Sequence, residues 1–116
     1  MNRDVFYLIN ILNPFDDWEN NGDAQRNLEA KEALCRVYGK LLKMKVDRQY
    51  KVYRHHTSYL YQLIPLNKAL MENKYLTACN ELITLLHDEP FLQGRIYNNI
   101  IKTLRSNLGD KEAGDV

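Results

Sequence analysis

The chain has 116 residues, with 16 Lys and Arg against 15 Asp and Glu, so its formal net charge is +1. Hydrophobic residues make up 45% and charged residues 27%, a balance that is ordinary for a globular domain able to build a core without metal or disulfide staples. We expect one helical domain over 1–109 and a flexible tail over 110–116. The longest apolar run, 5–12, is too short to span a bilayer, and no signal-peptide pattern opens the chain. We therefore expect a cytoplasmic protein with no membrane partner.

The first half of the chain predicts two helices. Val5, Leu8, Ile9 and Leu12 repeat at helical spacing and predict a helix over about 3–12 that is apolar nearly all round and buried on several sides. Pro14 ends it. Asp23 is a good N-cap for a second helix over about 24–45. The apolar stripe predicted for this helix comprises Leu28, Leu34, Cys35, Tyr38, Leu41 and Leu42. Gly39 lies inside it, either as a close helix crossing or as a weak point.

Two further helices are predicted around Pro65. The residues Val46, Tyr50, Tyr53, Thr57, Leu60 and Ile64 keep one helical period, which favours a helix over about 47–64. Pro65 is expected to kink or end this helix, because proline lacks the backbone N–H and clashes with the preceding turn. A short helix over 66–73 follows.

The last third predicts two more helices, over about 75–87 and 89–107. The first is the cleanest amphipathic pattern of the chain, and the second begins with Asp88 as cap and Pro90 in its first turn. Gly109 is a plausible C-terminal stop. The fold class is therefore all-α, a compact bundle or an orthogonal array of five to six helices.

One segment resembles the second helix of a tetratricopeptide repeat. Ala78, Leu82, Leu85 and Pro90 stand at the offsets of that pattern, whereas Gln62, Pro65, Leu66 and Ala69 depart from its first helix. No second copy appears at a period of 34 residues. The resemblance implies only that 66–73 and 75–87 pack as an antiparallel hairpin, and it assigns no family.

The residues that could carry chemistry match no known catalytic or metal-binding pattern. The five glycines are scattered singly, and His55, His56 and His87 lack the spacing of a zinc motif. Asp16, Asp17 and Glu19 lack the glycine and the downstream glutamate of a calcium loop. Cys35 and Cys79 match no ligand or redox spacing and are expected to be buried thiols. We therefore expect no enzyme activity, no metal and no cofactor, the weaker alternative being acid–base chemistry at His87 and the carboxylates after it.

Charge is distributed unevenly along the chain. Residues 1–35 carry a net charge of −4, residues 36–56 a net charge of +6 and residues 57–116 a net charge of −1. Arg36, Lys40 and Lys43 fall on one helix face. Such a surface could bind an acidic protein, lie on phosphates, pair internally with the acidic 16–32 segment, or only face solvent.

The sequence therefore predicts a small non-enzymatic protein that binds another protein as a regulator, inhibitor, adaptor or chaperone. Its candidate binding residues are a basic set and two aromatic anchors: Arg36, Lys40, Lys43, Arg48, Lys51, Arg54, Phe15 and Trp18. Phe15 and Trp18 could instead fold back as a lid on the core. The alternative function is a nucleic-acid-binding regulator that uses residues 36–54. A homodimer is also possible, because surplus apolar surface often marks an interface.

Overall fold

The computed structural model describes residues 3–44, 56–87 and 94–109 of the chain. These residues form five α-helices, α1 (Arg3–Leu12), α2 (Ala24–Lys43), α3 (His56–Met71), α4 (Tyr75–His87) and α5 (Gly94–Leu104). Two short 3₁₀ turns, η1 (Asn13–Phe15) and η2 (Trp18–Asn20), join α1 to α2, and a π-helical turn over Arg105–Gly109 follows α5. No strand occurs in these ranges, so the all-α class is confirmed.

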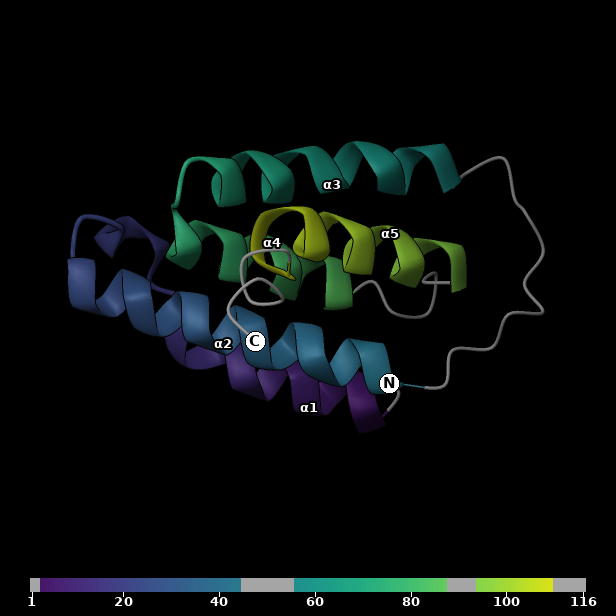
Figure 1. Ribbon diagram of the computed structural model, residues 1–116, viewed down its shortest axis with the longest axis horizontal. Coiled ribbons are helices and arrows are strands. Elements are labelled where there is room, and N and C mark those ends of the chain that lie inside the picture. Colours follow the sequence, from purple (N-terminus) through teal and green to yellow (C-terminus); the bar gives the residue numbers. More distant parts are fainter. Residues whose placement is uncertain (1–2, 45–55, 88–93, 110–116) are drawn as a thin grey trace.

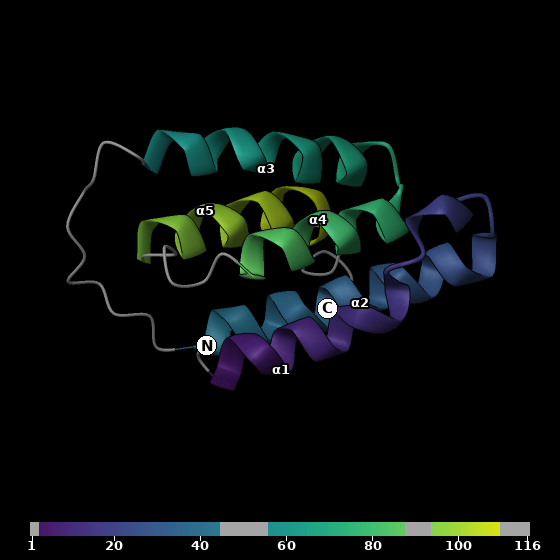
Figure 2. The same cartoon turned by 180° about the vertical axis from the view of Figure 1, so that it is seen from behind.

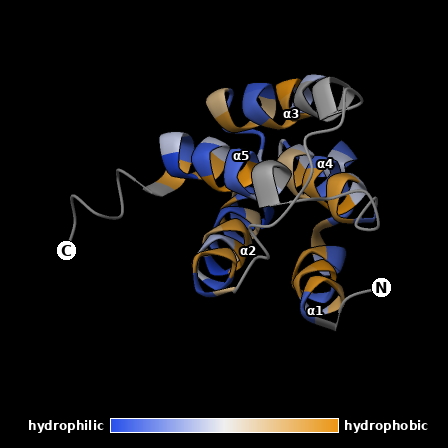
Figure 3. Ribbon diagram, turned by 90° about the vertical axis from the view of Figure 1, so that its right-hand side faces the viewer, coloured by the Kyte–Doolittle hydropathy of each residue, from blue (hydrophilic) through white to orange (hydrophobic). Residues whose placement is uncertain are grey.

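The five helices run alternately up and down the molecule, so it is a bundle and not an orthogonal array (Figure 1). Seen from behind, α1 lies beside α2 along one edge, and α3 lies along the other (Figure 2). The end-on view shows three layers, with α3 in the first, α4 and α5 in the second, and α1 and α2 in the third (Figure 3). The middle layer is therefore covered on both sides, and all three layers contribute buried residues to the core.

Helix α4 is the centre of the core. Eight of its thirteen residues are buried, and it packs against α1, α2 and α3. The sequence predicted that the first helix would be buried on several sides. That prediction is wrong, because Phe6 and Tyr7 of α1 are 55% and 53% exposed. Helix α1 lies at the edge of the bundle and buries a single stripe, Val5, Leu8, Ile9 and Leu12.

Helix α2 begins where the sequence predicted, since the Asp23 side chain accepts a hydrogen bond from the backbone N–H of Arg26 at 3.1 Å. Its buried face differs from the prediction, because Leu28 and Leu42 are half exposed and the face is Ala30, Ala33, Leu34, Val37 and Leu41. The two alanines let α4 approach closely. The Cys79 thiol lies 3.7 Å from the carbonyl oxygen of Ala30.

Helix α3 continues through Pro65, where the sequence predicted a break. The expected helices over 47–64 and 66–73 are one helix, His56–Met71, with Pro65 inside it. Pro65 lies on the exposed side, where water can bond the Tyr61 carbonyl that loses its partner. Leu63 and Leu66 are buried on either side of it and hold the helix in place, whereas Ile64 is exposed. The predicted residues 45–55 lie outside the described ranges.

Helices α3 and α4 form the expected antiparallel hairpin (Figure 1). Asn73 ends α3 in the left-handed region, with φ of 59°. The N–H of Lys74 bonds the Ala69 carbonyl at 2.9 Å, and the N–H of Asn73 bonds the Leu70 carbonyl at 3.2 Å. This pair of bonds is a Schellman motif, in which asparagine replaces the usual glycine.

The described part of helix α5 begins at Gly94 and buries Tyr97, Ile100 and Leu104. The predicted start with Asp88 and Pro90 lies outside the described residues, as does the tail 110–116. None of the helices in the described ranges combines the length and the apolar character needed to cross a membrane.

Candidate binding surfaces

The described part of the predicted basic surface is Arg36, Lys40 and Lys43, hereafter the basic strip. These residues lie at i, i+4 and i+7 of α2, and all three are exposed. Within the described ranges, none of them forms an ion pair. Arg48, Lys51 and Arg54, the other predicted members, lie outside the described residues.

Helix α1 adds an aromatic side chain to the basic strip. The Lys40 ammonium lies 4.8 Å from the centroid of the Tyr7 ring, a cation–π contact that leaves the lysine charge uncompensated. The two residues border a cleft of ≈ 550 Å³ between α1 and α2. We call it the α1–α2 cleft, and its lining consists of Asp4, Tyr7, Leu8, Lys40, Lys43 and Met44.

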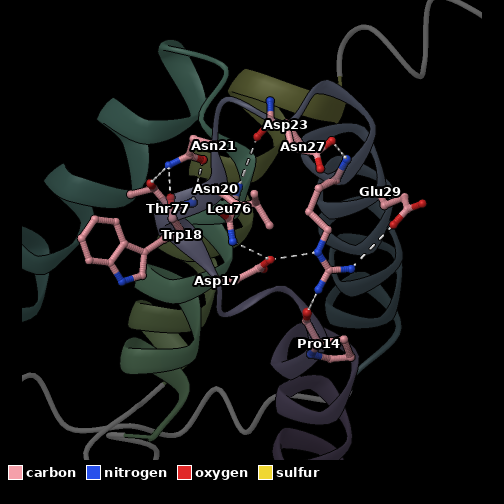
Figure 4. Close-up of polar contacts among 11 residues, drawn as sticks. Pro14, Asp17, Trp18, Asn20, Asn21, Asp23, Asn27, Glu29, Leu76 and Thr77 are labelled. Carbon is pink, nitrogen blue, oxygen red and sulfur yellow. Dashed lines mark hydrogen bonds and ion pairs between the residues drawn. The ribbon is translucent and has the colours of Figure 1, made fainter.

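Arg26, and not the basic strip, pairs with two carboxylates of the acidic segment 16–32, Asp17 and Glu29. The Arg26 guanidinium bonds Asp17 at 3.1 Å, approaches Glu29 at 3.6 Å and donates to the carbonyl of Pro14 (Figure 4). It also lies 4.6 Å over the ring of Phe15. The predicted pairing of the basic residues with the acidic segment is therefore wrong for the three basic residues described.

This contact sets the acidity of Asp17. Desolvation raises the pKa of the carboxyl, but hydrogen bonds from Arg26, from the backbone and from Asn20 outweigh it and hold the pKa below its usual 3.8. Asp17 is thus a structural anion paired with an arginine.

The two predicted aromatic anchors, Phe15 and Trp18, differ in their exposure to solvent. Phe15 is 8% exposed and belongs to the core, so it cannot serve as an exposed anchor. Trp18 is 48% exposed, and its ring points away from the surrounding polar contacts (Figure 4). It borders a second hollow of ≈ 450 Å³ between η2, α3 and α4, which we call the tryptophan groove. Its lining includes Glu19, Asn21, Pro65, Lys68, Glu72 and Glu81.

The reactive side chains are not assembled into a centre in the described part of the chain. No three His, Cys, Asp or Glu side chains gather there as a metal site would require. Cys35 and Cys79 are free thiols, and only Cys79 is fully buried. Burial raises the pKa of the Cys79 thiol to about 12, so it stays protonated at neutral pH.

The fold and these surfaces define a five-helix bundle with two hollows of opposite surroundings, one basic and one bordered by glutamates. Comparison with protein-family models, with curated proteins and with solved structures returned no match to this chain. Its function must therefore be argued from the surfaces themselves.

Sequence reasoning did not find Tyr7 or Arg26 as partners in these surfaces. Tyr7 meets Lys40 only because α1 and α2 pack side by side, and nothing local in the sequence fixes the register of that pair. Arg26 has a weak local signal, since Glu29 is three residues away on the same helix.

Proposed function

We propose that the protein is a non-enzymatic regulator or adaptor that binds an acidic surface of another protein through the basic strip and the adjoining α1–α2 cleft. The observation that carries this proposal is that the cations of the strip are exposed and unpaired within the described residues. Asp17 and Glu29 pair with Arg26 and not with the strip, so the strip keeps its charge for a partner.

Two features of the strip suit a protein partner. Opposite charge accelerates the encounter and fixes the orientation of a complex, while an aromatic side chain supplies contact area at low entropic cost. Lys40 and Tyr7 offer both at one point, and Leu8 and Met44 give the cleft an apolar floor. The free thiols of Cys35 and Cys79 suit a reducing compartment such as the cytoplasm.

Nucleic acid is the second candidate ligand, because exposed lysines beside an aromatic ring could also contact phosphates and a base. The near-neutral net charge of +1 counts against it, since dedicated nucleic-acid-binding domains are usually strongly basic. The same side chains serve both candidates. Salt dependence and the nature of the ligand distinguish them.

The test compares the wild type with the double variant Lys40→Glu, Lys43→Glu as bait in a lysate of the organism that encodes the chain. We expect the wild type to retain a protein partner and the variant to lose it. Labelled duplex DNA and single-stranded RNA are titrated in parallel by fluorescence anisotropy at low salt. Binding that weakens steeply with added salt would favour the nucleic-acid function instead.

The matched control is the double variant Lys31→Glu, Lys102→Glu. It changes the net charge by the same amount at two lysines of α2 and α5 that line neither hollow. It should retain the partner. If both variants lose the partner, net charge alone explains the binding, and if both retain it, the basic strip is only solvated surface.

A further inference from the structure

The two hollows lie at opposite ends of α2. The turn η2, which carries Trp18, precedes the first turn of α2, and Lys40 and Lys43 lie in its last turn. At 1.5 Å per residue, the helix separates these ends by about 28 Å. The acidic end and the basic end of one molecule therefore cannot neutralise each other directly.

The tryptophan groove is bordered by carboxylates. Glu19 and Glu81 line it and form no ion pair within the described residues, whereas the charge of Glu72 is balanced by Lys74 at 3.6 Å. Lys68 and Lys74 also line the groove, so its three carboxylates exceed its cations by one. The exposed indole of Trp18 stands among these residues, and indole is the aromatic ring that attracts a cation most strongly.

The α1–α2 cleft has the complementary set of groups. It presents two ammonium groups, Lys40 and Lys43, beside the Tyr7 ring, with Asp4 as its one carboxylate among the described lining residues. An indole inserted there would bury apolar area against the Tyr7 ring and Met44 and face both cations. Glutamates beside that indole would meet the lysines.

We propose that the partner of the basic strip is a second copy of this chain, whose tryptophan groove docks on the α1–α2 cleft end to end. This inference rests on the proposed function, because it uses the same strip and names its occupant. The contact is heterologous: each copy offers a groove at one end and a cleft at the other. Such a contact extends into longer assemblies or closes into a ring.

The first measurement is the mass of the wild type by light scattering over a range of concentrations at low salt. We expect it to rise with concentration above the 13.7 kDa of one chain and to fall back in high salt. The emission of Trp18, the only tryptophan of the chain, should shift to shorter wavelength as the assembly forms. A mass that stays at one chain under all these conditions overturns the inference.

Two variants then isolate a single junction. The cleft variant, Lys40→Glu with Lys43→Glu, keeps an intact groove. The groove variant, Glu19→Gln with Glu81→Gln and Trp18→Phe, keeps an intact cleft. Each should be monomeric alone, with association weakened at least tenfold. Their equimolar mixture should form a dimer and nothing larger. The Trp18 of the cleft variant is then the only tryptophan present, and its emission should shift to shorter wavelength as it becomes buried.

The two variants have opposite net charges, so the control adds Trp18→Ala to the cleft variant and leaves every charge unchanged. The dimer should then be lost. A dimer that persists, or a mixture that stays monomeric, contradicts the end-to-end contact. If the chain is monomeric throughout but its lysate partner still depends on Lys40 and Lys43, this inference fails and the proposed function stands.

Discussion

The side-chain oxygen of Asn27 in α2 accepts a hydrogen bond from the backbone N–H of Tyr75, the first residue of α4, at 2.8 Å. The two residues are 48 positions apart in the sequence. The Asn27 amide nitrogen also donates to the carbonyl of Asn73 at 2.7 Å, and its oxygen lies 3.4 Å from the N–H of Leu76. Asn21 bonds Thr77, two residues beyond Tyr75 along α4, through both its amide atoms. The first turn of the central helix is thus capped by side chains from another part of the chain.

Replacing Asn27 by alanine should therefore destabilise the whole bundle. The change leaves the part-buried N–H groups of Tyr75 and Leu76 and the exposed carbonyl of Asn73 without this partner. Loss of a cap and of a part-buried hydrogen bond together predict a decrease of about 2 kcal/mol in the free energy of unfolding. Urea denaturation followed by circular dichroism measures it.

Two further variants separate the cap from other effects. Asn27→Asp keeps the acceptor for Tyr75 and removes only the donor to Asn73. Its free energy of unfolding should therefore decrease less than that of Asn27→Ala. Asn10→Ala removes an exposed asparagine on α1 and should change the stability little. Equal losses for Asn27→Ala and Asn10→Ala would mean that the cap contributes nothing to stability.

The helices that sequence reasoning located best were those with local boundary signals. Pro14 and Asp23 delimit the ends of α1 and α2, and the bounds of α4 agree with the prediction at both ends. The break expected at Pro65 was wrong because the packing of Leu63 and Leu66 outweighs the local preference of proline. Apolar periodicity also misplaced the buried face of α2, since the small side chains of Ala30 and Ala33 leave a weak signal.

The surfaces were predicted only in part because they depend on tertiary register. Charge counting found Arg36, Lys40 and Lys43, which the structure exposes. It could not show that Arg26 forms an ion pair with Asp17. It also could not show which of Phe15 and Trp18 enters the core, because both lie in the same loop. The cap on α4 has no sequence signature, since its donor and acceptor come from segments far apart in the chain.

Gly39 is a weak point of α2. It lies inside the helix, its φ is not positive, and a Cβ built there would meet nothing within 4 Å. The close helix crossing that the sequence allowed for is therefore absent at this position. Gly39→Ala should stabilise the protein by about 0.5–1 kcal/mol, because alanine loses less backbone entropy on helix formation. The reverse change, Ala33→Gly, should be destabilising, and a Gly39→Ala variant with a lower urea midpoint would reveal a contact absent from this packing.

Asp17 should make the stability sensitive to acid. Its pKa in the folded protein lies below 3.8, so the folded state releases this proton more readily than the unfolded state. The resulting stabilisation is complete above about pH 4 and is lost as the pH falls through the pKa of the folded state. Urea denaturation between pH 7 and pH 3 should show that the free energies of unfolding of the wild type and of Asp17→Asn converge at the acid end. Asp16→Asn changes an exposed neighbour, and its free energy of unfolding should depend on pH as that of the wild type does. If the difference in free energy of unfolding between the wild type and Asp17→Asn is the same at every pH, the pairing with Arg26 is contradicted.

Cys79 should report opening of the core, because it is buried where α2 and α4 meet. Burial raises the pKa of its thiol from 9.0 to about 12, which lowers the thiolate fraction near pH 8 about a thousandfold. In a Cys35→Ser variant, a disulfide reagent should therefore label Cys79 only as fast as the bundle opens, and urea below the midpoint should accelerate the reaction. The Cys79→Ser variant retains Cys35, which is partly exposed, and should be labelled faster. Equal labelling rates for the two thiols in the native protein would place Cys79 at the surface and contradict the close α2–α4 contact on which the core is built.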